Sequence, residues 1–319
     1  MSLPLRPALG IDLGGTKIEA VLFALDGSEL WRRRSATPAG SYDGTVTALA
    51  DAVAAARQAV GGQASSRQAL SIGVGSPGTR TASGLMKNCN STCLNGRPLQ
   101  RDIEAAVGQP VALANDANCL ALSEVTDGAA AGAEVVFAAI LGTGAGGGIA
   151  VHGRVLGGAN GLAGEWGHNP LPWAVSGEDP AFACYCGQRG CIESLVSGSG
   201  LAQDHRHVTG QALDGQAIAA AAAAGDVACR ATLDRHAHRL ARALASVVNL
   251  LDPDVIVLGG GLSRLPHLYT QVPALWARWV FSGAIDPPRT RLVPSLHGDA
   301  SGVRGAAWLG RDLDRAAAT

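Results

Sequence analysis

The chain of 319 residues has few aromatic residues and almost no net charge. Phe, Trp and Tyr make up 4% of it, which argues against a binding module built on aromatic anchors. The formal net charge is −1, so the sequence lacks the basic footprint of a nucleic-acid-binding protein. With 43 glycines, the composition favours a turn-rich α/β enzyme with no nucleic-acid partner.

The sequence also lacks any segment with the length and apolarity of a membrane span. Its first eight residues hold one arginine and two prolines and no apolar run of a secretion signal. We therefore expect a cytoplasmic protein without a membrane partner. The length allows two domains, each with a substantial core.

The hydrophobic pattern predicts two similar α/β halves, each opening with strand, glycine turn and strand. A ligand-binding cleft between the two halves is expected. In the first half, a helix over 42–60 and a helix over 100–107 separate short strands. In the second half, helix dominates residues 213–251, and a final helix covers 303–317. The first predicted strand begins with the apolar residues 8–9 and leads into the turn at 11–17. The other predicted strands are 18–24, 29–34, 70–74, 111–114, 135–141, 149–151, 154–156 and 255–258.

The first glycine turn, residues 11–17, carries an acid, two glycines, a hydroxyl and a lysine. Glycines let backbone N–H groups wrap around an anion, and Thr16 and Lys17 add a hydroxyl and a positive charge. Asp12 lies at the strand end, where a carboxylate can hold Mg²⁺ directly or through water. The alternative is an ordinary hairpin turn.

Two later glycine runs also follow apolar strands. Residues 142–148 include Thr143 and suit a second phosphate clamp, against the alternative of a flexible loop. Residues 259–261 are consistent with a simple turn or with bare backbone against an adenosine. For each of these two runs, the residues alone leave both alternatives open.

Asp116 follows a predicted strand and the amide Asn115. An aspartate at that position is consistent with a helix N-cap. It is equally consistent with a general base held by Asn115, a role that typically contributes about 10²–10⁴ in rate.

One histidine and three closely spaced cysteines suit a structural zinc site. Cys184, Cys186 and Cys191 lie within eight residues, and His168 precedes them, which gives the Cys₃His ligand set. The alternative is free cysteines packed as small hydrophobic side chains. Glu193 follows the last cysteine and is expected to point toward the cleft. The other cysteines show no ligand spacing and are expected to be packing residues: Cys89, Cys93, Cys119 and Cys229.

Over nearly its whole length the chain resembles the ROK family of sugar kinases, which have the two-domain actin-like/hexokinase (ribonuclease H-like) ATPase fold. Residues 11–17 and 142–148 resemble the two phosphate motifs, and 259–261 resembles the adenosine motif. Residues 165–168 resemble the Glu-x-Gly-His motif, and 184–193 resembles the zinc motif. The resemblance implies a small domain of residues 1–114 plus 301–319 and a large domain of residues 115–300.

Within the family, the sequence is most similar to bacterial fructokinases, also called mannokinases. The residues behind this likeness are 87–96, 114–118, 165–173 and 297–299. Cys89 and Cys93 depart from the Ala and Trp expected there. The resemblance implies transfer of the γ-phosphoryl group of ATP to the 6-hydroxyl of D-fructose. N-acetylglucosamine, glucose and mannose are alternative substrates, and a catalytically inactive sugar sensor is an alternative class.

Family repressors carry a DNA-binding helix-turn-helix before the sugar domain, for which ten residues before Ile11 are expected to leave no room. The resemblance further implies a homodimer, and ATP, Mg²⁺ and structural Zn²⁺ as cofactors. His168 would hold zinc with one ring nitrogen and a sugar hydroxyl with the other, and Asp116 would act as the catalytic base. The implied ATP-binding residues are Asp12, Gly14, Gly15, Thr16, Lys17, Gly142, Thr143, Gly144, Gly259, Gly260 and Gly261. The implied sugar-binding residues are Asn90, Asn115, Asp116, Glu165, His168, Glu193, Gly75, Pro77 and Gly78.

Overall fold

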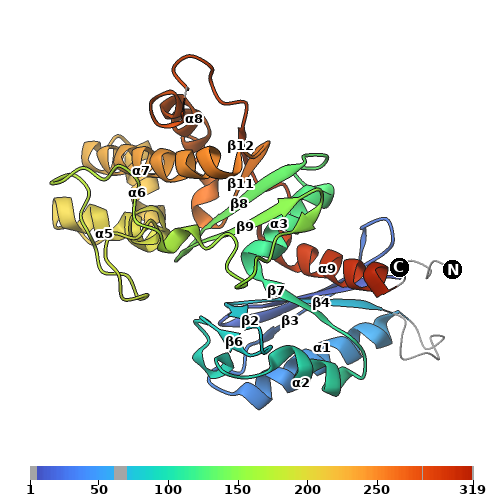
Figure 1. The fold of residues 1–319 in the computed structure, drawn as a ribbon. Helices are drawn as coiled ribbons and strands as arrows, with labels where there is room; N and C mark the ends of the chain where they lie inside the picture. Colours follow the sequence, from blue (N-terminus) through green and yellow to red (C-terminus); the bar gives the residue numbers. More distant parts are fainter. Residues whose placement is uncertain (1–5, 61–69, 282, 318–319) are drawn as a thin grey trace. The chain divides into compact units, whose positions relative to one another are not determined.

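The computed structural model describes residues 6–60, 70–281 and 283–317. Contacts between residues divide the chain into two compact units. Figure 1 shows the fold, with the ribbon coloured along the sequence. Unit 1 comprises Met1–Asp127, Val155–Ala163 and Ala300–Thr319, and unit 2 comprises Gly128–Arg154 and Gly164–Asp299.

Unit 1 extends beyond the boundary at residue 114 that the sequence analysis expects, because it includes helix α3 (Asp116–Asp127). This helix packs against α9 (Ser301–Ala317), the last helix of the chain. Buried Ser301 donates a hydrogen bond to the Glu124 carboxylate at 2.9 Å. Side-chain contacts with the C-terminal helix therefore place α3, and Asp116 with it, in unit 1.

The sheet of unit 1 has the strand order β3-β2-β1-β4-β7. Strand β1 pairs antiparallel with β2 and parallel with β4, and β4 pairs parallel with β7. The carboxyl ends of β1, β4 and β7 therefore meet at one edge of the sheet. The strands are β1 (Ala8–Leu13), β2 (Lys17–Phe23), β3 (Glu29–Ala36), β4 (Ser71–Ser76) and β7 (Ala112–Asn115).

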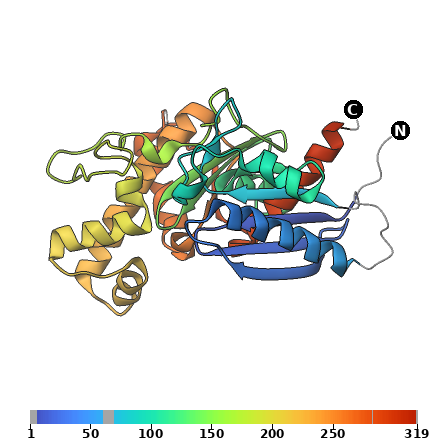
Figure 2. The same ribbon diagram turned by 90° about the horizontal axis from the view of Figure 1, so that it is seen from below.

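Helices cover both faces of this sheet. Helices α1 (Tyr42–Ala59) and α2 (Leu99–Val107) lie on one face, and α3 and α9 lie on the other (Figure 1). Figure 2 shows α1, in blue, lying over the strands. Helix α1 begins where Ser41 accepts a hydrogen bond from the Gly44 N–H at 3.1 Å, which is a normal N-cap. Between α1 and α2 lie the small hairpin β5 (Thr79–Arg80) and β6 (Met86–Lys87) and the 3₁₀ turn η1 (Thr92–Leu94).

Helix α9 reaches the sheet at positions where only glycine fits. A Cβ atom on Gly10 of β1 would lie 1.8 Å from the Val303 carbonyl oxygen, and one on Gly73 of β4 would lie 1.9 Å from the Ala306 carbonyl oxygen. The glycines allow backbone-to-backbone packing that any side chain would prevent. No periodic pattern in the sequence indicates this contact.

The sheet of unit 2 has the order β10-β9-β8-β11-β12, with β10 at the unit boundary. Strands β8 and β9 pair antiparallel, and β11 pairs parallel with β8 and β12, so β8, β9 and β11 repeat the arrangement of β1, β2 and β4. The strands are β8 (Val135–Leu141), β9 (Ala145–Val151), β10 (Arg154–Val155), β11 (Val255–Gly259) and β12 (Arg291–Pro294).

Helix α7 (Val227–Leu251) is the central helix of unit 2 and packs against α4 (Glu193–Val196), α5 (Gly198–Thr209), α6 (Gly215–Ala223) and α8 (Leu268–Trp279). The 3₁₀ turns of this unit begin at Trp166 (η2, to His168), Gly261 (η3, to Arg264) and Gly298 (η4, to Ala300).

Helix α7 brings two arginines into the interior of unit 2. Arg239 pairs with Asp179 and Asp204 at 2.8 Å, and Arg242 pairs with Asp179 at 2.8 Å. Burial by itself would raise the pKa of Asp179, but the hydrogen bonds from Arg242 and Arg239 outweigh it and lower the pKa to about 2. Among the described helices, none combines the length and apolarity required to cross a bilayer.

Candidate active site and metal centre

The first glycine turn joins β1 to β2. The Gly14 N–H donates to the Lys17 carbonyl at 2.9 Å and closes the turn, and Gly15, Thr16 and Lys17 are exposed. Thr37, the first residue after β3, binds the backbone of this turn. Its hydroxyl donates to the Gly14 carbonyl at 2.7 Å, and its N–H donates to the Thr16 carbonyl at 3.0 Å. Sequence reasoning missed Thr37, which only the pairing of β3 with β2 brings near the turn.

Asp12 lies in β1 opposite Gly75 of β4. Burial raises the pKa of the Asp12 carboxyl to about 6, and the charges of Asp116 and Glu19 act in the same direction. A Cβ on Gly302 would lie 3.6 Å from Asp12, so the first turn of α9 is close to the carboxyl. Carboxylate oxygens are the usual protein ligands of Mg²⁺, and a cation would relieve the repulsion, so Asp12 fits a magnesium site.

Asp116 begins α3, directly after β7 ends at Asn115. The Ala117 N–H donates to Asn115 Oδ1 and to Asp116 Oδ1, both at 2.8 Å. Asn115 accepts from the second residue after it and is therefore the N-cap of α3, so the cap lies one residue before Asp116, which is the first helical residue. The Asp116 side chain is solvent-exposed, yet the surrounding protein desolvates the carboxyl and raises its pKa. A carboxylate whose pKa is raised is a better proton acceptor than an ordinary one.

Asn115 connects β7 to the loop after β4, because its amide nitrogen donates to the Gly78 carbonyl at 3.3 Å. Gly78 has φ +71°, and a Cβ there would lie 2.4 Å from the Lys87 carbonyl oxygen. The Cys89 thiol donates to the Pro77 carbonyl at 3.2 Å. This cysteine, which stands where the family resemblance predicts alanine, therefore links the loop after β4 with the loop of residues 87–96, and both are predicted to bind sugar.

Asn95 fixes the backbone of the same region. Its Oδ1 accepts from the Cys89 N–H at 2.9 Å, and its Nδ2 donates to the Cys89 carbonyl at 3.1 Å. Asn90 lies in the loop that this pair of bonds shapes, and its own side chain accepts from the Ser91 N–H at 2.7 Å. Asn95 lies within residues 87–96, and the sequence alone predicts no role for it.

The second glycine turn is shorter than the glycine run predicts. Strand β9 begins at Ala145, so only residues 142–144 form the turn, and the Gly142 N–H donates to the Gly144 carbonyl at 3.0 Å. The expectation that residues 142–148 are all turn is wrong because Ala145–Gly148 pair antiparallel with Leu141–Ala138 of β8 and so belong to β9. Gly147 packs closely against Gly164, whose Cβ would lie 2.4 Å from the Gly147 carbonyl oxygen.

The third glycine run follows β11, which ends at Gly259. Gly260 has φ +79°, and a Cβ there would lie 2.6 Å from the Leu141 carbonyl oxygen. The predicted adenosine segment and the second phosphate turn are therefore neighbours in unit 2.

The segment 164–168 is fixed to β9. Trp166 donates from Nε1 to the Gly146 carbonyl at 2.9 Å and stands edge-on to Phe137, with ring centroids 5.5 Å apart. Glu165 and His168, predicted to bind sugar, flank this anchor. The Glu193 carboxylate accepts from the Ala145 N–H at 2.9 Å, so it too is tied to β9.

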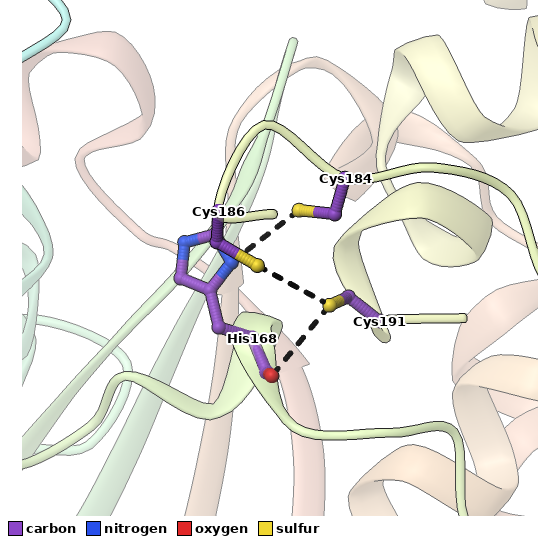
Figure 3. A group of neighbouring side chains, drawn as sticks. All are labelled: His168, Cys184, Cys186 and Cys191. Atoms are coloured by element: carbon purple, nitrogen blue, oxygen red, sulfur yellow. Dashed lines mark hydrogen bonds between the residues drawn. The ribbon is translucent and has the colours of Figure 1, made fainter. Parts of the chain in front are cut away.

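His168, Cys184, Cys186 and Cys191 form one cluster, with their ligand atoms within 4.8 Å of one another (Figure 3). The Cys186 and Cys191 sulfurs are 3.6 Å apart, and Cys184 Sγ lies 3.5 Å from His168 Nδ1. With Zn–S bonds of about 2.3 Å, the edge of a tetrahedral site is about 3.8 Å. The donor set and spacing fit structural zinc with no open position.

The two ring nitrogens of His168 face different partners. Nδ1 faces the sulfurs, while Nε2 lies 3.0 Å from the Tyr185 hydroxyl. A hydrogen bond from the Gln188 backbone lowers the pKa of Cys186 to about 7, which favours the thiolate that a metal binds. Burial instead raises the pKa of Cys191 to about 12.

The predicted residues fall in two sets, each brought together within its own unit. Unit 1 holds Asp12, Gly14, Gly15, Thr16, Lys17, Gly75, Pro77, Gly78, Asn90, Asn115 and Asp116. Unit 2 holds Gly142, Thr143, Gly144, Glu165, His168, Cys184, Cys186, Cys191, Glu193, Gly259, Gly260 and Gly261.

Comparison with solved structures defines the class of fold. A ROK hexokinase from Thermus thermophilus is similar with a TM-score of 0.81 and 32% identity, covering 97% of this chain and 99% of that one. A ROK family glucokinase from Streptomyces griseus, solved with glucose and AMPPNP, has a TM-score of 0.74 and 29% identity, covering 96% and 99%. The fold is the actin-like ATPase fold of the hexokinases, as the sequence predicts.

Sequence comparison defines the family. Residues 8–312 match the ROK family, to which this chain belongs. An N-acetyl-D-glucosamine kinase of Pectobacterium carotovorum is 38% identical over 305 residues, which are 94% of this chain and 97% of that protein. The family assignment from sequence is confirmed, and the chain is similar throughout to sugar kinases.

Proposed function

We propose that this protein transfers the γ-phosphoryl group of ATP to the 6-hydroxyl of a hexose. The observation that carries the proposal is the pair Asp12 and Asp116 at one edge of the unit 1 sheet, each with a raised pKa, beside an exposed glycine turn. Phosphoryl transfer needs a metal ligand, a proton acceptor and a phosphate cradle, and this edge offers all three.

Each residue then has a role. Asp116 accepts the proton of the attacking hydroxyl, and Asp12 holds Mg²⁺, which neutralises phosphate charge when it is bound. The first turn and the second turn, with Gly259–Gly261, bind the nucleotide. The remaining residues bind the sugar hydroxyls: Asn90, Asn115, Glu165, His168 and Glu193, with Gly75, Pro77 and Gly78 shaping the loop.

Zinc is proposed to be structural. The cluster would fix His168 through Nδ1, which leaves Nε2 for a sugar hydroxyl in place of Tyr185. Because the second nitrogen of a metal-bound histidine is oriented by the metal, the ring would read the sugar in one fixed position.

For the sugar, we propose N-acetyl-D-glucosamine first and D-fructose second. The 38% identity to a protein named N-acetyl-D-glucosamine kinase supports the first, and the motif likeness around Asn90 supports the second. Glucose and mannose complete the set to be compared. A homodimer remains part of the proposal, and light scattering of the purified protein tests it.

Identification of the product tests the proposed reaction. The protein is incubated with ATP, Mg²⁺ and each of the four sugars, and the product is analysed by phosphorus NMR and mass spectrometry. We expect a hexose 6-phosphate and ADP in equal amounts. A phosphate at another carbon would refute the assigned position, and ADP with free phosphate would indicate ATP hydrolysis instead of transfer.

A further inference from the structure

The start of helix α5 binds two consecutive carbonyl groups of the second phosphate turn. The Gly198 N–H donates to the Gly142 carbonyl at 2.7 Å, and the Ser199 hydroxyl donates to the Thr143 carbonyl at 2.7 Å. A trans peptide is planar, with its C=O and N–H pointing in opposite directions. Each bond therefore also fixes the direction of the next N–H group, that of Thr143 and that of Gly144.

The N–H groups of Thr143 and Gly144 follow one another along the second phosphate turn. The hydrogen bonds of the described residues leave the N–H groups of Thr143 and Gly144 without a partner. Consecutive N–H groups on one side of a turn form an anion-binding nest. The next N–H, that of Ala145, is already held by Glu193 Oε2 at 2.9 Å, so the nest has a fixed end.

The Ser199 hydroxyl is itself held in position. Ser197 Oγ lies 3.0 Å from Ser199 Oγ and accepts from the Gly200 N–H at 3.0 Å as the N-cap of α5. A hydroxyl has one proton to donate, and Ser199 gives it to Thr143, so Ser197 is the donor between the two serines. Ser199 is exposed, and its side chain contributes little to the core.

We propose that Ser199 is a positioning residue for the nucleotide: it holds the peptide plane between Thr143 and Gly144, and so aims the Gly144 N–H at a phosphate oxygen. The inference rests on the proposed function of the turn and adds to it a residue that touches neither phosphate nor sugar. Without the hydroxyl, the peptide can rotate and the anion loses a preorganised donor.

The test compares Ser199→Ala with Ser199→Thr, which keeps a hydroxyl, and with the control Ser246→Ala. Ser246 makes a hydroxyl-to-carbonyl bond of equal length, 2.7 Å to Ala243, inside α7. KM for ATP, KM for the preferred hexose, kcat and thermal stability are measured for each variant. Affinity for AMPPNP with Mg²⁺ is measured by calorimetry without sugar.

For Ser199→Ala we expect KM for ATP and the Kd of AMPPNP to rise about threefold to tenfold, the range of one lost hydrogen bond. KM for the hexose, kcat and Tm are expected to stay near wild type, as are all values for Ser199→Thr and Ser246→Ala. Unchanged AMPPNP affinity, or an equal loss for sugar and nucleotide, would overturn the inference. If the wild type phosphorylates no hexose, the proposed function fails, and calorimetry still decides the role of Ser199. A wild type that does not bind AMPPNP would refute both.

Discussion

At the scale of single residues, the proposed phosphoryl transfer depends on Asp116. Asp116 is the first residue of α3, and Asn115 before it caps the helix by accepting from the Ala117 N–H. An amide of the same size at position 116 therefore removes the proposed base and leaves the cap in place.

Asp116→Asn is expected to lower kcat by about 10²–10⁴-fold, because an amide does not accept the proton of the attacking hydroxyl. Tm and AMPPNP affinity are expected to stay close to wild type, since Asn115 still caps the helix and the amide has the size of the carboxylate. The matched control is Asp26→Asn, an exposed aspartate in the β2–β3 turn whose carboxylate accepts from the Ser28 N–H at 2.9 Å. A kcat for Asp116→Asn within tenfold of wild type would exclude the residue as the base.

The residue scale also shows where sequence reasoning succeeds and where it fails. The pattern at 11–17 and the spacing of Cys184, Cys186 and Cys191 are local, so residues near in sequence carry the information. Thr37 and Ser199 act on backbone groups distant from them along the chain, and Asn95 acts on the backbone of its own loop. Ordinary polar side chains of this kind have no local signature, and only the folded chain identifies them.

At the scale of elements, we expect the close approach of α9 to the sheet to contribute to the stability of unit 1. The helix returns from the far end of the chain and packs on β1 and β4 through glycines. Sequence periodicity predicts the helix over 303–317 but not its partner, because a missing side chain has no hydrophobic signal.

Gly73→Ala is expected to lower the free energy of unfolding by about 1–3 kcal/mol or more, since the new Cβ would meet the Ala306 carbonyl oxygen at 1.9 Å. An alanine in a strand is otherwise preferred over glycine by about 0.5–1 kcal/mol, so the sign of the change is diagnostic. Urea denaturation measures it. The control Gly157→Ala places a Cβ where nothing lies within 4 Å. A stabilised Gly73→Ala protein would contradict the packing described.

The metal cluster is the second element-scale feature. Cys186→Ser is expected to reduce bound zinc from about one ion per chain to almost none and to lower Tm, because a structural site needs all four ligands. Elemental analysis of protein purified without added metal is the measurement. Cys93→Ser, a half-buried cysteine outside the cluster, is the control. Zinc content unchanged by Cys186→Ser would rule out the Cys₃His site.

At the scale of the whole molecule, a buried histidine is expected to lower the stability in weak acid. His236 of α7 bonds through Nε2 to the Val196 carbonyl at 2.9 Å, and burial lowers its pKa to about 4. The unfolded chain takes up this proton near pH 6.5, and the folded chain only near pH 4. The stabilisation is therefore complete above pH 6.5 and is lost as the pH falls toward 4.

Between pH 7 and pH 5 this one group is expected to lower the free energy of unfolding by about 2 kcal/mol. The loss is measured as the difference between wild type and His236→Gln, whose amide can donate to Val196 but does not titrate in this range. The lowered pKa of Asp179 acts only below pH 4, so it does not interfere. Parallel pH profiles for the two proteins would refute the assignment.

The sequence therefore predicts the fold class, the two glycine hairpins and the grouping of His168 with three cysteines, and the described residues show each of these. Zinc binding by this cluster stays a prediction. The sequence misplaces helix α3, which contacts from the C-terminal helix assign to unit 1. It also predicts fructose, whereas the similar kinase of Pectobacterium carotovorum reported above is named for N-acetyl-D-glucosamine. Contacts such as that of Cys89 with Pro77 lie in the loops predicted to bind sugar, and the motifs shared across a family do not encode them.

The most direct test of the central claim is the rate of ADP release with ATP and Mg²⁺, measured with and without each of the four sugars. We predict release that depends on sugar, with the highest kcat/KM for N-acetyl-D-glucosamine. A preference for fructose would keep the proposed reaction and overturn the proposed substrate. ADP release that is absent, or equal with and without every sugar, would contradict the account of a hexose kinase.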